Sequence, residues 1–165
     1  MVQATLRPEG RLVLAGRAFR AAIGRGGVRP DKQEGDGATP AGTLPLRRVL
    51  YRADRVPPPA CAVPLEPIGA QDGWCDDPAH PDYNRIVRLP HAARCEELWR
   101  SDGLYDIVGV LGWNDAPVER GRGSAIFLHV ATGDFAPTAG CIALAALDLR
   151  AVLEAGLTEI RTDPA

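Results

Sequence analysis

Short apolar runs separated by turn-forming residues make up most of the hydrophobic pattern of this chain. Near the N-terminus these runs are interrupted at Pro8-Glu9-Gly10 and at Ala15-Gly16, which favour tight turns. Further runs rich in apolar and β-branched residues lie at 44–52, 85–89, 104–113 and 124–131. Runs of this length between turn residues predict β-strands.

Two segments instead have the spacing of amphipathic helices. Residues 91–100 follow Pro90, a residue type common at helix starts, and gather apolar side chains on one face. Residues 147–156 carry Asp148 as a capping residue and end at Gly156, which can stop a helix. We therefore expect short helices at both places.

Composition favours a single mainly β domain over residues 1–165. Glycine (18) and proline (15) are too frequent for a helical bundle in a chain of 165 residues. This length suits one domain with a hydrophobic core. Residues 55–84 fit no regular element, and we expect a long loop that is either functional or held on the surface by Trp74 and Tyr83.

Charge and hydropathy narrow the range of partners. The formal net charge of −2 gives no bulk attraction to nucleic acid. No apolar run approaches the roughly 20 residues of a membrane-spanning helix. The first residues lack the basic start and cleavage site of a signal peptide, so the chain is either a mature form or not exported by that route. We expect no nucleic-acid partner and no membrane span.

The most informative pair of reactive residues is His129 and Cys141. A thiolate is the nucleophilic form of cysteine, and a neighbouring histidine can take its proton. Gly140 permits a tight turn in which the N–H groups of Ala139, Gly140 and Cys141 converge on an oxyanion. The spacing fits a base and a nucleophile joined by a hairpin-like loop, although a cysteine in an apolar run is more often a core residue.

Three segments carry a resemblance to a known family: GSAIFLHVA, PTAGCIAL and, far upstream, DGATPAGTLPL at 36–46. Together they resemble the catalytic domain of the YkuD-type L,D-transpeptidases over roughly residues 10–160. The resemblance implies a mainly β fold, a sandwich or barrel with a few short helices. It also implies an enzyme that cross-links diaminopimelate-containing peptidoglycan stem peptides through a cysteine acyl-enzyme, with no metal or organic cofactor.

The resemblance assigns roles to four residues. Cys141 matches the nucleophile, His129 the base, Gly140 the glycine of the signature and Thr138 its Ser/Thr. It further implies the periplasm or cell envelope as the location, with the cytoplasm as the alternative because no signal peptide is visible. We expect a monomer.

Two positions depart from the family pattern. Ala139 stands where the signature usually has histidine, and Ala143 stands where it commonly has arginine. Because lost polar contacts change substrate discrimination, we expect an altered donor or acceptor preference and a non-standard linkage. Arginine binds carboxylates in a bidentate manner, which makes the two arginines before the His129 run candidates for carboxylate recognition. Substrate contacts are therefore expected from Thr138, Ala139, Arg120, Arg122, Tyr83 and Asn84.

Two alternatives to a transpeptidase use the same scaffold. In an L,D-carboxypeptidase or endopeptidase, water replaces the attacking amine. In an inactive peptidoglycan-binding module, the intact His129 and Cys141 would have no purpose. An active pair predicts that the pKa of the Cys141 thiol lies below the roughly 8.5 of a free thiol.

A metal site and a phosphate loop are weaker interpretations. The zinc candidates lack a Cys-x-x-Cys pair, so we expect no metal; they are Cys61, Cys75, His80, His91 and Cys95. If the protein is exported, a disulfide between Cys61 and Cys75 is an alternative. The GRGGV segment at 24–28 lacks the Gly-Lys-Ser/Thr of a phosphate loop and predicts a turn at a strand end.

Overall fold

The protein consists of fourteen β-strands and one α-helix in a computed structural model that describes residues 1–165. The first seven strands are β1 Gln3–Arg7, β2 Arg11–Leu14, β3 Arg17–Ala22, β4 Val28–Arg29, β5 Thr39–Pro40, β6 Gly42–Tyr51 and β7 Leu65–Pro67. The others are β8 Asp72–Cys75, β9 Ile86–Arg88, β10 Cys95–Glu97, β11 Ile107–Leu111, β12 Phe127–Val130, β13 Ile142–Leu144 and β14 Glu159–Thr162. The helix is α1, Ala146–Glu154.

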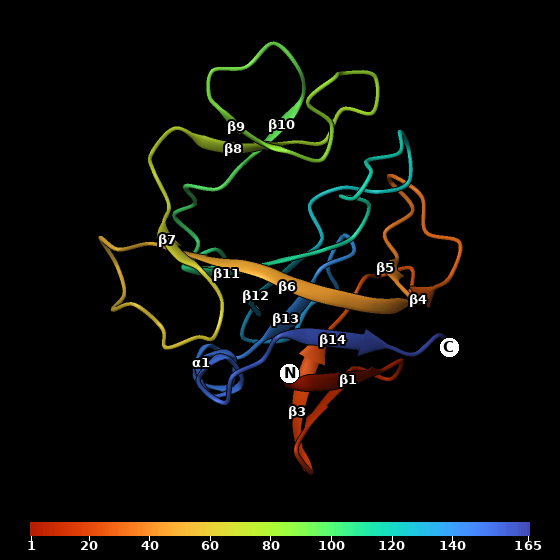
Figure 1. Ribbon diagram of the computed structural model, residues 1–165, viewed down its shortest axis with the longest axis vertical. Helices are drawn as coiled ribbons and strands as arrows, with labels where there is room; N and C mark the ends of the chain where they lie inside the picture. The colour runs from red at the N-terminus through yellow and green to blue at the C-terminus, as the bar shows by residue number, and fades with distance from the viewer.

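The largest sheet closes on itself as a barrel. Its strands follow the order β11-β12-β13-β3-β2-β1-β14-β6, and β6 pairs again with β11 (Figure 1). Strand β6 makes both contacts because Gly42–Pro45 pairs with β14 and Leu46–Tyr51 pairs with β11. The predicted mainly β fold of sandwich or barrel type is confirmed.

Two groups of buried apolar side chains stabilise the barrel. The main core has 21 residues and includes Leu149, Val152 and Leu153 from α1. A second core of ten residues contains Cys141 and centres on Phe127. The Phe127 ring is packed edge-to-face by two other aromatic rings, which fixes its position. The nucleophile predicted from the sequence therefore belongs to the same buried core as this aromatic group.

The four predicted strands are confirmed with shifted ends. Residues 44–52, 85–89, 104–113 and 124–131 correspond to β6, β9, β11 and β12. The turns predicted near the N-terminus are also present, because β1, β2 and β3 are successive antiparallel strands joined there.

The C-terminal helix is confirmed as α1, but one of its predicted ends is wrong. Its N-cap is Ala145, which makes no side-chain capping bond, and Asp148 lies inside the first turn. Gly156 does end the helix: its φ is +92° and its N–H donates to the Leu153 carbonyl at 2.9 Å. This single helix has nine residues, too few to cross a membrane.

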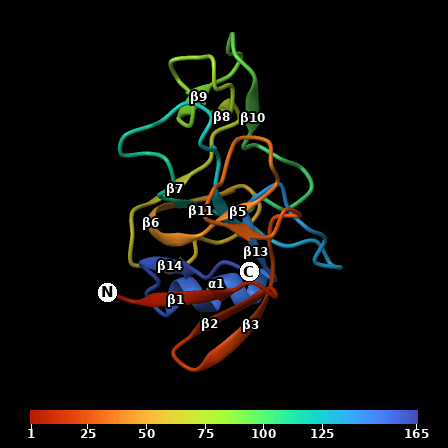
Figure 2. The same ribbon diagram turned by 90° about the vertical axis from the view of Figure 1, so that its right-hand side faces the viewer.

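The helix predicted over 91–100 is wrong. This segment contains β10, which joins β8 and β9 in a small three-stranded sheet at the top of Figures 1 and 2. Leu98 is buried in the second core, and Trp99 packs against the same core with the Arg52 guanidinium 3.5 Å from its ring centre. The irregular loop predicted over 55–84 is wrong in part, since it contains β7 and β8.

Candidate active site

Strand register places the predicted base and nucleophile on one face of the sheet. Strands β12 and β13 are parallel, with His129 opposite Ala143. Side chains two residues apart in a strand share a face, so Cys141 points to the same side as Ala143 and His129. The predicted hairpin-like connection is therefore wrong, because parallel strands need a crossover, here through residues 131–141.

This face opens into a pocket. The strands and the crossover contribute His129, Cys141 and Ala143, together with Thr138 and Ala139. Residues outside these segments also line the pocket: Glu34, Asp76, Glu96, Arg100 and Tyr105. The pocket thus combines a thiol and an imidazole with several charged side chains.

The Cys141 thiol is buried and protonated in this arrangement. It donates to the Ala125 carbonyl at 3.2 Å and accepts from the Phe127 N–H at 3.4 Å. Burial, reinforced by the nearby negative charge of Glu96, raises the pKa of the thiol to about 12. The predicted lowering of this pKa is therefore wrong: desolvation outweighs the favourable backbone contact.

His129 is held as a neutral base. Its Nδ1–H donates to the Val130 carbonyl at 2.8 Å, which leaves Nε2 without its proton in the neutral ring. Burial of the ring lowers the pKa of His129. No hydrogen bond joins the ring to the Cys141 thiol, whose proton is directed to Ala125 instead. The resting pair is thus a neutral thiol and a neutral imidazole.

The pH dependence of alkylation checks this protonation state. We expect the rate of Cys141 modification by iodoacetamide, followed by peptide mass mapping, to keep rising above pH 9, beyond the roughly 8.5 of a free thiol. N-acetylcysteine provides the reference curve. A plateau reached below pH 8.5 and lost in His129→Asn would instead indicate a thiolate–imidazolium pair.

The turn before Cys141 presents two free amide donors. Gly140 has a φ of +139°, and a Cβ there would lie 2.9 Å from the Ala38 carbonyl, so only glycine fits. The Gly140 N–H donates to Thr138 Oγ1 at 3.1 Å. The N–H groups of Ala139 and Cys141 have no partner within the protein. Of the three donors predicted for an oxyanion, two are thus available and the Gly140 N–H is engaged.

Residues 36–46, the upstream segment that carried part of the resemblance, form a hydrogen bond with this turn. Thr39 donates from its hydroxyl to the Gly140 carbonyl at 2.9 Å and accepts from the Gly24 N–H at 2.9 Å. Nearby, the buried Lys32 ammonium lies 2.6 Å from Asp36 Oδ1. The contact of Thr39 with Gly140 spans 101 residues of chain and was therefore not predictable from local sequence patterns.

Thr138 and Ala139 line the pocket as expected, but the Thr138 hydroxyl is used within the turn. It donates to the Cys141 carbonyl at 2.6 Å while accepting from Gly140. Thr138 can therefore contact a substrate in the pocket, but its hydroxyl proton is already donated to the Cys141 carbonyl.

Tyr83 and Asn84 lie behind the pocket instead of lining it. Asn84 Oδ1 accepts from the N–H of Ala125, the residue whose carbonyl receives the thiol proton. The Tyr83 hydroxyl donates to Glu34 at 2.8 Å, and burial beside that carboxylate raises the pKa of Tyr83. Both residues position the pocket wall, and neither contacts its open space.

The two arginines predicted to bind a carboxylate lie outside the pocket. Arg120 donates to the Ala79 carbonyl, and Arg122 is paired with Glu119 at 2.9 Å. Arg100 is the arginine that lines the pocket; its guanidinium lies over the Tyr105 ring and 2.5 Å from Asp102. The sequence did not reveal Arg100, because its segment was predicted to be helical.

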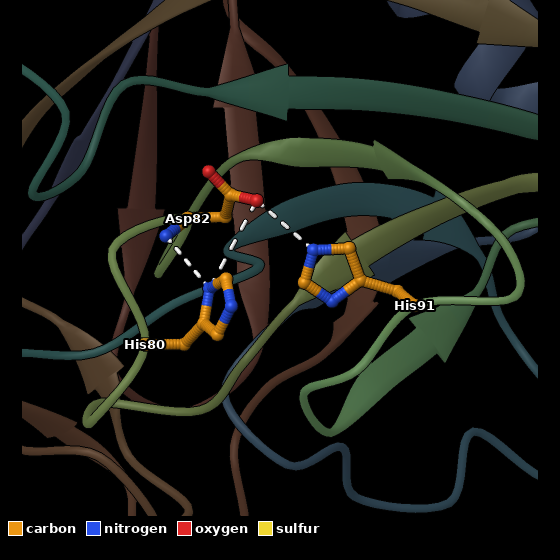
Figure 3. A group of neighbouring side chains, drawn as sticks. All are labelled: His80, Asp82 and His91. Carbon is orange, nitrogen blue, oxygen red and sulfur yellow. Dashed lines mark hydrogen bonds and ion pairs between the residues drawn. The ribbon is translucent and has the colours of Figure 1, made fainter.

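Part of the proposed zinc set comes together, but without its cysteines. The ligand atoms of His80, Asp82 and His91 all lie within 4.8 Å of one another, in the loops that connect the strands of the small sheet (Figure 3). His91 uses both ring nitrogens, since Nδ1 accepts from the Ala93 N–H and Nε2 bonds to Asp82. A ligating histidine normally donates its other ring N–H, which is not possible here. These contacts identify a hydrogen-bonded group, and we assign it no metal.

The remaining alternatives from the sequence are resolved by local structure. All four cysteines are free. Cys75 is opposite Cys95 in the small sheet, whereas Cys61 packs against the main core, so a Cys61–Cys75 disulfide is not formed. The GRGGV segment is a turn that leads into β4, as predicted.

Comparison with known proteins assigns a family. The family model for YkuD, the L,D-transpeptidase catalytic domain, matches residues 5–160. The match includes every pocket residue described above. Among curated proteins, none matches the chain.

Proposed function

The chain belongs to the YkuD family of L,D-transpeptidase catalytic domains, and from this membership we propose that it is a peptidoglycan L,D-transpeptidase with Cys141 as nucleophile. One observation carries the proposal: a thiol shares a pocket face with a neutral imidazole, beside two unpartnered backbone N–H groups. These are the three components that acyl transfer needs. The cell envelope is the proposed location.

The first half of the reaction forms a thioester. When substrate enters, the thiol leaves the Ala125 carbonyl and passes its proton to His129 Nε2. Sulfur then attacks a carbonyl on the C-terminal side of an L-configured centre in the donor stem. The oxyanion accepts hydrogen bonds from the Ala139 and Cys141 N–H groups. As the C–N bond breaks, the leaving amine takes the proton from His129.

The second half transfers the acyl group. An amine of a second stem peptide attacks the thioester and gives a proton to His129. The C–S bond breaks, the sulfur regains the proton, and an amide joins the two stems. Because burial raises the pKa of the resting thiol, little thiolate is present before the substrate binds.

The two alanines of the signature support an unusual linkage. Ala139 and Ala143 both line the pocket, and Ala143 is the direct neighbour of His129 across the strands. The pocket therefore lacks the histidine and arginine that the family signature places at these two positions, although His129 and Arg100 line it elsewhere. We expect a cross-link other than the ordinary bond between two diaminopimelates, since buried polar contacts discriminate strongly between substrates.

Product analysis tests this proposal. Purified monomeric muropeptides are incubated with the protein, and the products are sequenced by mass spectrometry. We expect dimers, with a linkage that involves a different stem position. Trimmed monomers without dimers would instead identify an L,D-carboxypeptidase or endopeptidase, and ordinary diaminopimelate dimers alone would contradict the altered preference.

A further inference from the structure

One carboxylate of the pocket is held in place without a cationic partner. Glu34 lies between β4 and β5 and lines the pocket with Ser124. Its Oε1 accepts from the Tyr83 hydroxyl at 2.8 Å and from the Ser124 hydroxyl at 2.5 Å. Its backbone N–H donates to the Gly121 carbonyl at 2.8 Å. Backbone and side chain are thus both fixed.

The other oxygen of Glu34 has no protein partner. No hydrogen bond reaches Oε2, and no arginine, lysine or histidine forms an ion pair with Glu34. This oxygen is not a buried orphan either, since the only such side-chain atom belongs to Asp106. It is therefore an oriented, negatively charged acceptor that remains accessible.

The other pocket carboxylates are already occupied. Asp76 is paired with Arg94 at 3.0 Å, while Glu96 accepts from the Tyr105 hydroxyl and lies 3.9 Å from Arg100. Among these carboxylates, only Glu34 is oriented by two hydroxyl groups and has no ion-pair partner. A fixed carboxylate in a partly enclosed pocket binds a cation with N–H donors more strongly than a mobile surface carboxylate does.

We propose that Glu34 binds a primary ammonium group of the substrate, with Tyr83 and Ser124 as its positioning residues. This inference rests on the proposed function, because the proposed substrate contains diaminopimelate, and diaminopimelate carries a free amine at the end of its side chain. The ammonium group can belong to the donor stem, or to the acceptor stem before its amine is deprotonated for attack. The two sources predict different kinetic effects.

Glu34→Gln is the informative variant. Glutamine has the same shape, and its amide oxygen can accept from both hydroxyls, so the fold is retained while the charge is lost. Glu119→Gln, at an exposed glutamate outside the pocket, is the matched control. Thermal unfolding of both variants should match that of the unaltered protein.

Two kinetic measurements distinguish the sources of the ammonium. In the donor measurement, acylation of Cys141 is followed by intact mass with a stem peptide whose side-chain amine is free or acetylated. In the acceptor measurement, the preformed acyl-enzyme partitions between added diaminopimelate and water. If the ammonium belongs to the donor, we expect the free-amine peptide to acylate Cys141 about tenfold faster than the acetylated one, and this preference to be lost in Glu34→Gln but not in Glu119→Gln. If it belongs to the acceptor, we expect the ratio of transfer to hydrolysis to fall about tenfold in Glu34→Gln and to stay unchanged in Glu119→Gln. Tyr83→Phe should reduce the preference partially.

Other outcomes would overturn the assignment. If Glu34→Gln slows free and acetylated substrates equally, Glu34 is structural. If it alters neither measurement, Glu34 does not bind the ammonium. If the unaltered protein forms no acyl-enzyme at all, the proposed function fails, and the role of Glu34 is tested by equilibrium binding of the free and acetylated peptides to Cys141→Ala. Equal affinity for the two peptides would refute ammonium binding by Glu34. A preference for the free peptide that is lost in the Cys141→Ala, Glu34→Gln double variant would support it.

Discussion

Cys141→Ser should lower the rate of acyl transfer by at least about a thousandfold while leaving the fold intact. The serine hydroxyl can still donate to the Ala125 carbonyl, so the contacts that hold the side chain are retained. A hydroxyl at this position is a far weaker nucleophile than a thiol that passes its proton to His129. The rate of dimer formation and the thermal unfolding midpoint measure the two effects separately.

The matched control is Cys61→Ser. The Cys61 thiol also donates to a backbone carbonyl, that of Val63, but Cys61 does not line the pocket. We expect its activity within about threefold of the unaltered protein, as for other replacements away from the reacting groups. Dimer formation at an unchanged rate in Cys141→Ser would exclude Cys141 as the nucleophile.

His129→Asn should reduce turnover by about 10²–10⁴-fold, the usual effect of losing a general base. Asparagine can place an N–H near the position of Nδ1 and keep the contact with the Val130 carbonyl, but it has no equivalent of Nε2. The variant should gain activity steadily as the pH is raised, because hydroxide then replaces the base and the thiol pKa is high. The measurement is kcat/KM for acyl-enzyme formation between pH 6 and pH 10.

His80→Asn serves as the comparison, since His80 lies in the loop between β8 and β9, outside the pocket. An asparagine oxygen can accept from the Asp82 N–H as His80 Nδ1 does. Its pH profile should follow that of the unaltered protein. If His129→Asn showed a similarly unchanged profile, another group would be the base.

Local sequence patterns predicted half of the strands, and they singled out His129 and Cys141, which the fold places in one pocket. Runs of apolar and β-branched residues predicted β6, β11 and β12, and the glycine before Cys141 indicated a tight turn. Closure of the barrel was not predictable in this way. It depends on β6 pairing with both β14 and β11, contacts between segments that lie far apart in sequence.

The errors in the site have a common physical origin in tertiary contacts. Residues 91–100 have helical spacing, but pairing with Cys75 and burial of Leu98 convert the segment to a strand and bring Arg100 into the pocket. Arg120 and Arg122 are close to His129 in sequence, yet they point to Ala79 and Glu119. The predicted pKa of the Cys141 thiol was wrong because the sequence does not show how completely the fold buries this side chain.

Roles for Glu34 and Tyr83 likewise emerged only from the structure. Tyr83 was predicted to contact substrate, and it instead orients Glu34, which the sequence did not single out. These two residues are 49 positions apart. Only the fold shows that their side chains meet at the pocket wall, where Glu34 faces the pocket and Tyr83 lies behind it.

Mass analysis of the protein after incubation with stem peptides tests the central claim most directly. Tri-, tetra- and pentapeptide stems containing diaminopimelate are each mixed with the protein, which is then measured intact and mapped by proteolysis. The mechanism predicts a mass increase equal to one stem peptide without its released C-terminal part, located on Cys141, and its disappearance as a dimer forms when an acceptor amine is added. Release of the C-terminal residue with no adduct on Cys141, or an adduct that persists in Cys141→Ala, would contradict it.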